Sequence, residues 1–247
     1  MTVRVDGTMT IRDLVGRYPQ TRPVFEAEGI DYCCGGGRRL VDVAGEQGLK
    51  LPALVDALER SLEASPGEQP AAGKDWYAEP LATLVDHIER VHHGYMKTAL
   101  PRLRSLLPTV LKAHGERHGE MLRRVQEVFQ ALDAELSSHL LKEEQMLFPY
   151  IVALEKHVGE GTPRPYACFD SARYPIAQME HEHESAGGAL ERLRDITGAY
   201  TLPADACPTF RALYEELQRM DGDLHQHIHL ENNVLFPRIA ALEASLP

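Results

Sequence analysis

The strongest constraint on the fold is a motif that the sequence contains twice. Residues 135–149 and 223–237 each carry, in the same order and spacing, an acidic residue, a histidine, a glutamate and Leu-Phe-Pro. On an α-helix, residues four positions apart share a face, so each copy directs an imidazole and a carboxylate to one point. A single pair of this kind most simply indicates a helix face that is exposed to solvent. Because the pair recurs inside an apolar stripe, where uncompensated carboxylates are costly, we expect His139, Glu143, His227 and Glu231 to bind metal.

A further histidine precedes each copy at a comparable distance. These histidines are His93 and His183, so the second half of the chain reads as two helical hairpins, each with one histidine on its first helix and His-x3-Glu on its second. Four imidazoles and two carboxylates suit a pair of iron ions, because imidazole binds iron and bridging carboxylates favour a dinuclear centre. A catalytic mononuclear zinc needs only three protein ligands. The predicted cofactor is therefore a non-haem di-iron centre, with or without an oxo bridge.

Composition bears on partners and location. The 247 residues carry a net charge of -11, which disfavours nucleic acid because binding to phosphates requires a basic surface. No apolar run approaches the length of a membrane span, and residues 1–13 lack the apolar core of a signal peptide. We therefore expect a cytoplasmic protein that binds neither membrane nor nucleic acid, with its four cysteines as thiols.

A stretch rich in proline and glycine divides the chain. Residues 64–75 are predicted to be a linker, because this composition cannot hold a regular element. The small domain before it, residues 1–63, should form helices at about 11–17, 22–28, 39–47 and 52–63. Residues 76–247 show helical periodicity and no alternating strand pattern. The expected fold class is all-α, a small helical domain followed by a four-helix bundle with an inward-facing metal centre.

Helical periodicity selects among the histidines of the bundle. His227 lies on the apolar stripe of its helix, whereas His225 and His229 point about 200° away and should face solvent. The same reasoning favours His183 over His181. Periodicity therefore predicts one ligand among the neighbouring histidines of each of these two helices.

The first helix of the bundle is ambiguous. Its apolar face centres on His92, and His93 lies about 100° further round. This helix should also be kinked or interrupted at Pro101. A rival ligand set would use the pairs Glu89–His92 and Glu180–His183, whose Glu-x2-His spacing matches ferritin-like di-iron bundles. That set leaves the repeated histidines unexplained.

Two acidic residues, Glu135 and Asp223, stand one turn before the repeated histidines. Each could accept a hydrogen bond from the second nitrogen of an imidazole or relay protons to the centre. A charge on a wet helix edge is an equal alternative for Asp223. Glu135 lies on the apolar stripe and is the candidate proton donor.

Taken together, the motifs resemble a known family. The segments that carry the resemblance are Asp31-Tyr32-Cys33-Cys34-Gly35-Gly36, Glu135-Leu136-Ser137-Ser138-His139 with Lys142-Glu143-Glu144-Gln145, and Leu230-Glu231-Asn232-Asn233-Val234-Leu235-Phe236-Pro237. Over nearly the whole chain they are similar to the di-iron iron-sulfur cluster repair proteins, the repair of iron centres family, whose C-terminal domain is hemerythrin-like. The resemblance implies a non-haem di-iron centre and a role in restoring iron-sulfur clusters damaged by nitric oxide or oxidants.

The resemblance also bears on the ligand of the first helix. The family frame is met by Pro80-Leu81-Ala82, Asp86-His87-Ile88, His93 and Leu100-Pro101, which implies His93 as the ligand. His92 and His181 depart from the family pattern and could be silent or modify the pocket. Oxygen-carrying hemerythrins use five histidines and two carboxylates. A set with one histidine fewer implies more open coordination, which argues against reversible oxygen storage.

Three functions remain open from the sequence. The leading one is a stress-response protein that binds nitric oxide or oxygen species and supplies iron to damaged iron-sulfur proteins. The second is an enzyme that reduces nitric oxide, with Glu135 as proton donor. The third is a gas-binding or sensing module. Cys33 and Cys34 could accept nitric oxide, contact a damaged cluster or pair between the chains of a homodimer, because adjacent cysteines form a mutual disulfide only with strain.

Overall fold

The structure, a computed structural model, describes residues 4–63 and 75–246. Within these ranges it contains helices and no strand, apart from an isolated bridge between Thr10 and Arg39, so the all-α prediction is confirmed. None of the described helices combines the length and the apolar character of a membrane span. The predicted linker lies outside the described residues except at its last position. The chain divides into two units, residues 1–84 with 228–238 and residues 85–227 with 239–247.

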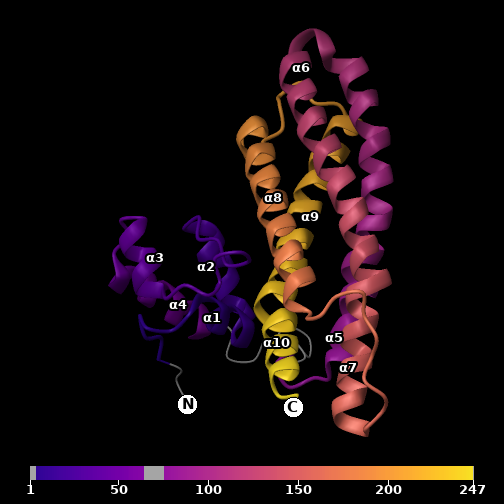
Figure 1. The fold of residues 1–247 in the computed structure, drawn as a ribbon. Coiled ribbons are helices and arrows are strands. Elements are labelled where there is room, and N and C mark those ends of the chain that lie inside the picture. Colours follow the sequence, from indigo (N-terminus) through magenta and orange to yellow (C-terminus); the bar gives the residue numbers. More distant parts are fainter. Residues whose placement is uncertain (1–3, 64–74, 247) are drawn as a thin grey trace. The chain divides into compact units, whose positions relative to one another are not determined.

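The first unit contains the small N-terminal helices at nearly the predicted bounds. Thr10 caps the first of them, because its hydroxyl oxygen accepts a hydrogen bond from the backbone N–H of Asp13 at 3.2 Å. Ile11, Phe25 and Leu58 are fully buried and form the centre of its core. The helices are α1 (Ile11–Arg17), η1 (Pro19–Thr21), α2 (Arg22–Ala27), α3 (Leu40–Glu46) and α4 (Leu51–Glu63) (Figure 1).

The remaining helices form a bundle. Ser185 donates a hydrogen bond to Glu135 at 2.8 Å between α8 and α6, and Tyr95 donates one to Glu216 at 2.9 Å between α6 and α9. Figure 1 shows these three helices side by side. The elements are α5 (Leu81–His87), η2 (Ile88–His93), α6 (Gly94–Lys142), η3 (Glu143–Leu147), α7 (Phe148–Glu160), α8 (Arg173–Thr197), α9 (Pro208–Leu230), η4 (Glu231–Leu235) and α10 (Phe236–Ala244).

Helix α6 reverses its direction and remains one continuous helix (Figure 1). Arg104 donates a hydrogen bond to Asp133 at 2.6 Å. On a straight helix, with a rise of about 1.5 Å per residue, these residues would lie roughly 40 Å apart. The first helix expected in the bundle thus corresponds to α5, η2 and the first leg of α6, and the second corresponds to the second leg of α6. Pro101 does not interrupt the helix, because α6 runs through both Pro101 and Pro108.

In the part of the chain that the structure describes, each of the three π-helical turns adjoins a predicted metal ligand. The turn η2 ends at His93, η3 begins at Glu143 and η4 begins at Glu231. Pro149 and Pro237 follow η3 and η4 at the second position of the next helix, where a proline cannot donate to the preceding turn and crowds it. The repeated Leu-Phe-Pro therefore favours a widened turn directly after each glutamate, and such turns often occur at functional sites.

Candidate metal centre

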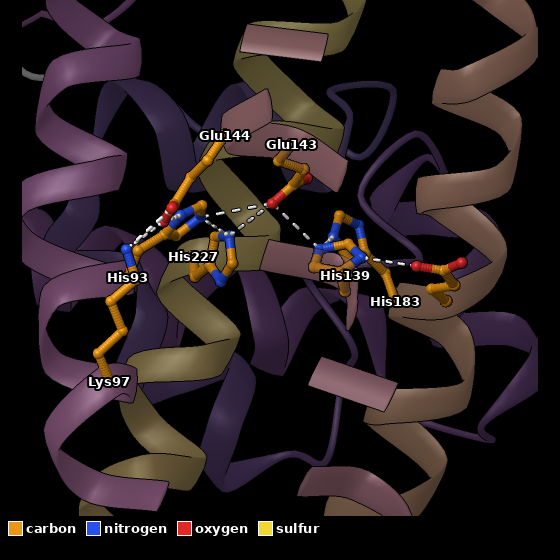
Figure 2. Close-up of polar contacts among 8 residues, drawn as sticks. His93, Lys97, His139, Glu143, Glu144, His183 and His227 are labelled. Carbon is orange, nitrogen blue, oxygen red and sulfur yellow. Dashed lines mark hydrogen bonds and ion pairs between the residues drawn. The ribbon is translucent and has the colours of Figure 1, made fainter. Parts of the chain in front are cut away.

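Four buried imidazoles converge on one buried carboxylate (Figure 2). Glu143 Oε2 lies 3.4 Å from Nε2 of His93, 3.3 Å from Nε2 of His139 and 3.9 Å from Nε2 of His227. The Nε2 atoms of His93 and His227 lie 3.3 Å apart, and those of His139 and His183 lie 3.1 Å apart. None of the five residues is more than 2% exposed. The histidines therefore form two pairs, one on each side of Glu143.

These pairs have the spacing of metal ligands. In one group the ligand atoms of His93, Glu143 and His227 lie within 4.8 Å of one another, and in the other those of His139, Glu143 and His183 do so. The chain passes directly from α9 into η4, so Glu231 lies one turn beyond His227, and it belongs to both groups. Because imidazole and carboxylate are ligands that transition metals accept together, this donor set fits a metal site.

His93 rather than His92 belongs to the converging set. His92 is also buried, but its Nδ1 lies 3.1 Å from Asp223 Oδ1, and its ring stacks on His227 with centroids 5.9 Å apart. Glu180, which the rival ligand set requires, is exposed. His93, which the family resemblance implied, thus lies in the converging set and His92, which periodicity preferred, lies beside it, and the role of His93 as a metal ligand stays a prediction.

Two glutamates contact the outer nitrogen of a predicted ligand histidine. Glu144 Oε1 lies 2.9 Å from His93 Nδ1, and Glu182 Oε2 lies 2.9 Å from His139 Nδ1. Since the Nδ1 atoms face these carboxylates, the Nε2 atom of each imidazole is the nitrogen directed to the centre. A carboxylate behind a ligand histidine fixes the orientation of the ring and makes the nitrogen that faces the metal a stronger donor.

Both outer carboxylates are held by lysines. Lys97 Nζ lies 2.6 Å from Glu144, and Lys142 contacts Glu182. Burial alone would raise the pKa of Glu182, but hydrogen bonds, led by those from Lys142 and Gln178, outweigh it and lower the pKa to about 2. Lys97 likewise lowers the pKa of Glu144 against the effect of burial. Both groups are therefore ionised acceptors at neutral pH.

The sequence predicts Glu135 and Asp223 for this outer role. Glu135 is exposed and accepts its hydrogen bond from Ser185, whereas Asp223 pairs with His92. Periodicity could not identify Glu144 and Glu182, because each directly adjoins a ligand and adjacent helical residues point about 100° apart. The role of Glu135 as a proton donor stays a prediction.

His229 is buried, so the prediction that it faces solvent is wrong. It is 1% exposed, and its Nδ1 lies 3.1 Å from Asn233 Nδ2. Its ring packs edge to face with the ring of Tyr32, and the two ring centroids lie 5.9 Å apart. Burial, followed by the nearby charge of Arg22, lowers the pKa of His229 to about 3. The imidazole is therefore neutral. Tyr32, which covers the ring, is distant in sequence, so helical periodicity could not indicate the burial of His229.

Cys33 and Cys34 follow Tyr32 in the same unit. Cys33 is buried, Cys34 is half-buried, and both are free thiols. The side chain of Asn233 donates a hydrogen bond to the carbonyl oxygen of Cys33 at 3.0 Å. The two thiols are thus attached to the segment that begins with Glu231.

Comparison with known proteins identifies the family to which the chain belongs. Residues 83–239 match the Hemerythrin HHE cation binding domain, and residues 7–62 match ScdA_N, a domain of unknown function. The iron-sulfur cluster repair protein YtfE of Salmonella paratyphi B is 37% identical over 225 residues, which cover 91% of this chain and 93% of that protein. YtfE of Salmonella newport has the same identity and coverage. The chain therefore belongs to the hemerythrin HHE family and, across both of its domains, to the family of YtfE iron-sulfur cluster repair proteins.

Proposed function

We propose that this chain is a di-iron protein that repairs iron-sulfur clusters damaged by nitrosative or oxidative stress, by supplying iron and by binding nitric oxide. The observation that carries the proposal is the placing of two buried histidine pairs on either side of Glu143. The relatives' name, iron-sulfur cluster repair protein, supports the substrate class. The role implies damaged iron-sulfur proteins as partners and the cytoplasm as the location.

Each iron would take one histidine pair, and Glu143 and Glu231 would be shared between the two ions. Bound iron would supply redox chemistry and positions that accept nitric oxide or oxygen species. The chain's own residues orient the ligands and exclude water from the site. Glu144 and Glu182 orient two of the imidazoles, and the full burial of the donor set excludes bulk water.

Reduction of nitric oxide is the weaker candidate. It requires a proton donor beside the centre, and the proposed donor, Glu135, is exposed and accepts a hydrogen bond from Ser185. Gas sensing would use the same metal site without transfer of iron. Only iron supply requires that iron leave the protein, so a transfer experiment separates iron supply from the other two functions.

The test measures whether the protein restores activity to a damaged iron-sulfur enzyme. Iron-loaded full-length protein is incubated with an iron-sulfur enzyme whose cluster nitric oxide has destroyed, together with sulfide and a reductant, and the activity of that enzyme is followed. The wild type and His181→Ala, whose side chain is 77% exposed, should restore activity, and Glu143→Ala should not. Equal recovery with Glu143→Ala, or none with the wild type, would contradict iron supply from this site.

A further inference from the structure

The turn that follows α2 brings two thiols and a carboxylate together. Cys33 Sγ lies 3.8 Å from Cys34 Sγ and 3.0 Å from Asp31 Oδ1. Ligand atoms of all three residues lie within 4.8 Å of one another. Two thiolates bound at about 2.3 Å to a tetrahedral ion are separated by roughly 3.8 Å. The spacing of the sulfurs is thus the one that a shared metal ion requires.

Hydrogen bonds to Asp31 hold this turn in shape. Its Oδ1 accepts from the backbone N–H groups of Cys33 at 2.9 Å and Cys34 at 3.0 Å, and its Oδ2 accepts from that of Gly35 at 3.2 Å. A carboxylate has about four acceptor positions, so these bonds leave room for a metal at the oxygen that faces the fewest donors, Oδ2. The backbone bonds therefore arrange the two sulfurs and the carboxylate before any ion arrives.

Asn233 holds the turn from the other side. Its side-chain Nδ2 donates to the carbonyl oxygens of Tyr32 at 3.1 Å and of Cys33 at 3.0 Å. A Cβ atom at Gly36 would lie only 2.3 Å from Asn233 Oδ1, so this close approach requires glycine. Because the turn is fixed on both sides, a bound ion would not have to order the chain, which favours binding.

We propose that Asp31, Cys33 and Cys34 form a second metal site, which binds one divalent transition-metal ion through two thiolates and one carboxylate. That the ion is Fe²⁺ rests on the proposed function, since a protein that supplies iron needs a position from which iron can leave. The bundle ligands are fully buried, whereas Asp31 is exposed and Cys34 is half-buried. Three protein ligands leave the fourth tetrahedral position open to a ligand of the receiving protein.

Binding at this site exchanges protons for the ion. Without metal, hydrogen bonding with Cys34 and burial raise the pKa of Cys33 well above its usual range, so its thiol is protonated at neutral pH. Each sulfur that binds the ion gives its proton to solvent, and the charge of the ion compensates the thiolate charge. Affinity should therefore increase with pH, as it does for other thiolate sites.

Cobalt(II) is the probe for this site, because thiolate ligands give it a strong near-ultraviolet charge-transfer absorption. Reduced full-length protein, with its bundle loaded with iron and its iron content measured, is titrated with Co²⁺ without oxygen. The variants are Cys33→Ser, Cys34→Ser and Asp31→Asn. Matched controls are Cys168→Ser and Cys207→Ser, which remove the other two free thiols. Circular dichroism establishes that each variant keeps its helices.

The wild type and both controls should bind one cobalt ion with thiolate absorption. Cys33→Ser and Cys34→Ser should lose at least half of that absorption and bind about tenfold more weakly or worse, by comparison with the losses that follow changes around metal sites. Cys34→Ser should disturb the fold less than Cys33→Ser, because Cys34 is only half-buried. Absence of thiolate absorption in the wild type, or its survival in both cysteine variants, would overturn the proposal. A bundle without iron would contradict the proposed function. The cobalt–thiolate absorption would still show whether Cys33 and Cys34 bind a metal ion.

Discussion

At the residue scale, the carboxylates behind the imidazoles determine how firmly the ligands are held. His93 and His139 each lie between Glu143 on the inside and an ionised glutamate on the outside, as Figure 2 shows for His93 and Glu144. The outer glutamate is in turn fixed by a lysine. Each chain of contacts therefore joins a buried ligand to a partly exposed, charged side chain, so surface residues can influence the metal.

Removing the charge of an outer carboxylate should weaken metal binding without loss of the fold. Glu144→Gln and Glu182→Gln keep the shape of the side chain but offer a neutral acceptor. We expect metal affinity to fall about 10- to 100-fold, measured as the rate at which a chelator removes iron. Glu184→Gln, on an exposed side chain of α8, is the control. Release rates equal to that of the control would contradict a positioning role.

At the element scale, the two copies of the motif diverge directly after the shared glutamate. In the first copy Glu144 braces His93, and in the second Asn232 and Asn233 hold the carbonyl oxygen of Cys33. The residues directly after the repeated glutamate thus contact a buried histidine of the bundle in one copy and, in the other, the turn that carries Cys33 and Cys34, here called the thiol turn. Divergence of a duplicated helix explains how one motif can orient a buried histidine in one copy and hold the thiol turn in the other.

Asn233→Ala should loosen the thiol turn. The substitution leaves the carbonyl oxygens of Tyr32 and Cys33 without this donor, and a buried polar group deprived of its partner costs about 1–3 kcal/mol. Denaturant unfolding should show that loss, and alkylation of Cys33 should accelerate. Asn232→Ala is the matched control, because its hydrogen bond to Cys33 is longer, at 3.4 Å. Slow alkylation in both variants would show that Asn233 does not hold the turn.

Pro149→Ala tests whether the repeated proline maintains the π turn that begins at Glu143. Alanine can donate the backbone hydrogen bond that proline lacks, so η3 should relax toward an α-helix and shift the glutamate away from the imidazoles. We expect lower iron content at unchanged helicity. Pro108→Ala, within α6, should keep the wild-type iron content. Full iron content in Pro149→Ala would mean that the turn persists without proline.

The features that could be predicted from the sequence are those that depend on local interactions. Helix bounds such as Ile11–Arg17 were predictable because a capping threonine and a following proline mark them. The repeat identified Glu143 and its histidine because helical spacing is a property of one segment. The burial of His229 was not predictable, since Tyr32 covers it from a distant part of the sequence. The reversal within α6 passes Gly115 and Gly119, which lie about midway between the paired Arg104 and Asp133, but the helix continues through both glycines, so no loop separates the two legs.

At the scale of the whole molecule, the chain offers metal ligands of two kinds. The bundle provides fully buried imidazole and carboxylate ligands, and the N-terminal turn provides thiols and a carboxylate that are partly accessible. Buried ligands favour retention of a metal, and accessible ones favour its exchange. A protein that stores iron and releases it to damaged clusters needs both properties.

Iron stoichiometry tests whether the bundle holds a di-iron centre between Glu143 and the two histidine pairs. Elemental analysis of the purified full-length chain, combined with Mössbauer spectroscopy, gives the number of iron ions and shows whether they are coupled. With the thiol turn emptied by a mild chelator, the account predicts two coupled irons per chain. It also predicts clearly less than two in Glu143→Ala and in Glu231→Ala. A single uncoupled iron, another metal in its place, or two coupled irons retained in both variants would contradict the account.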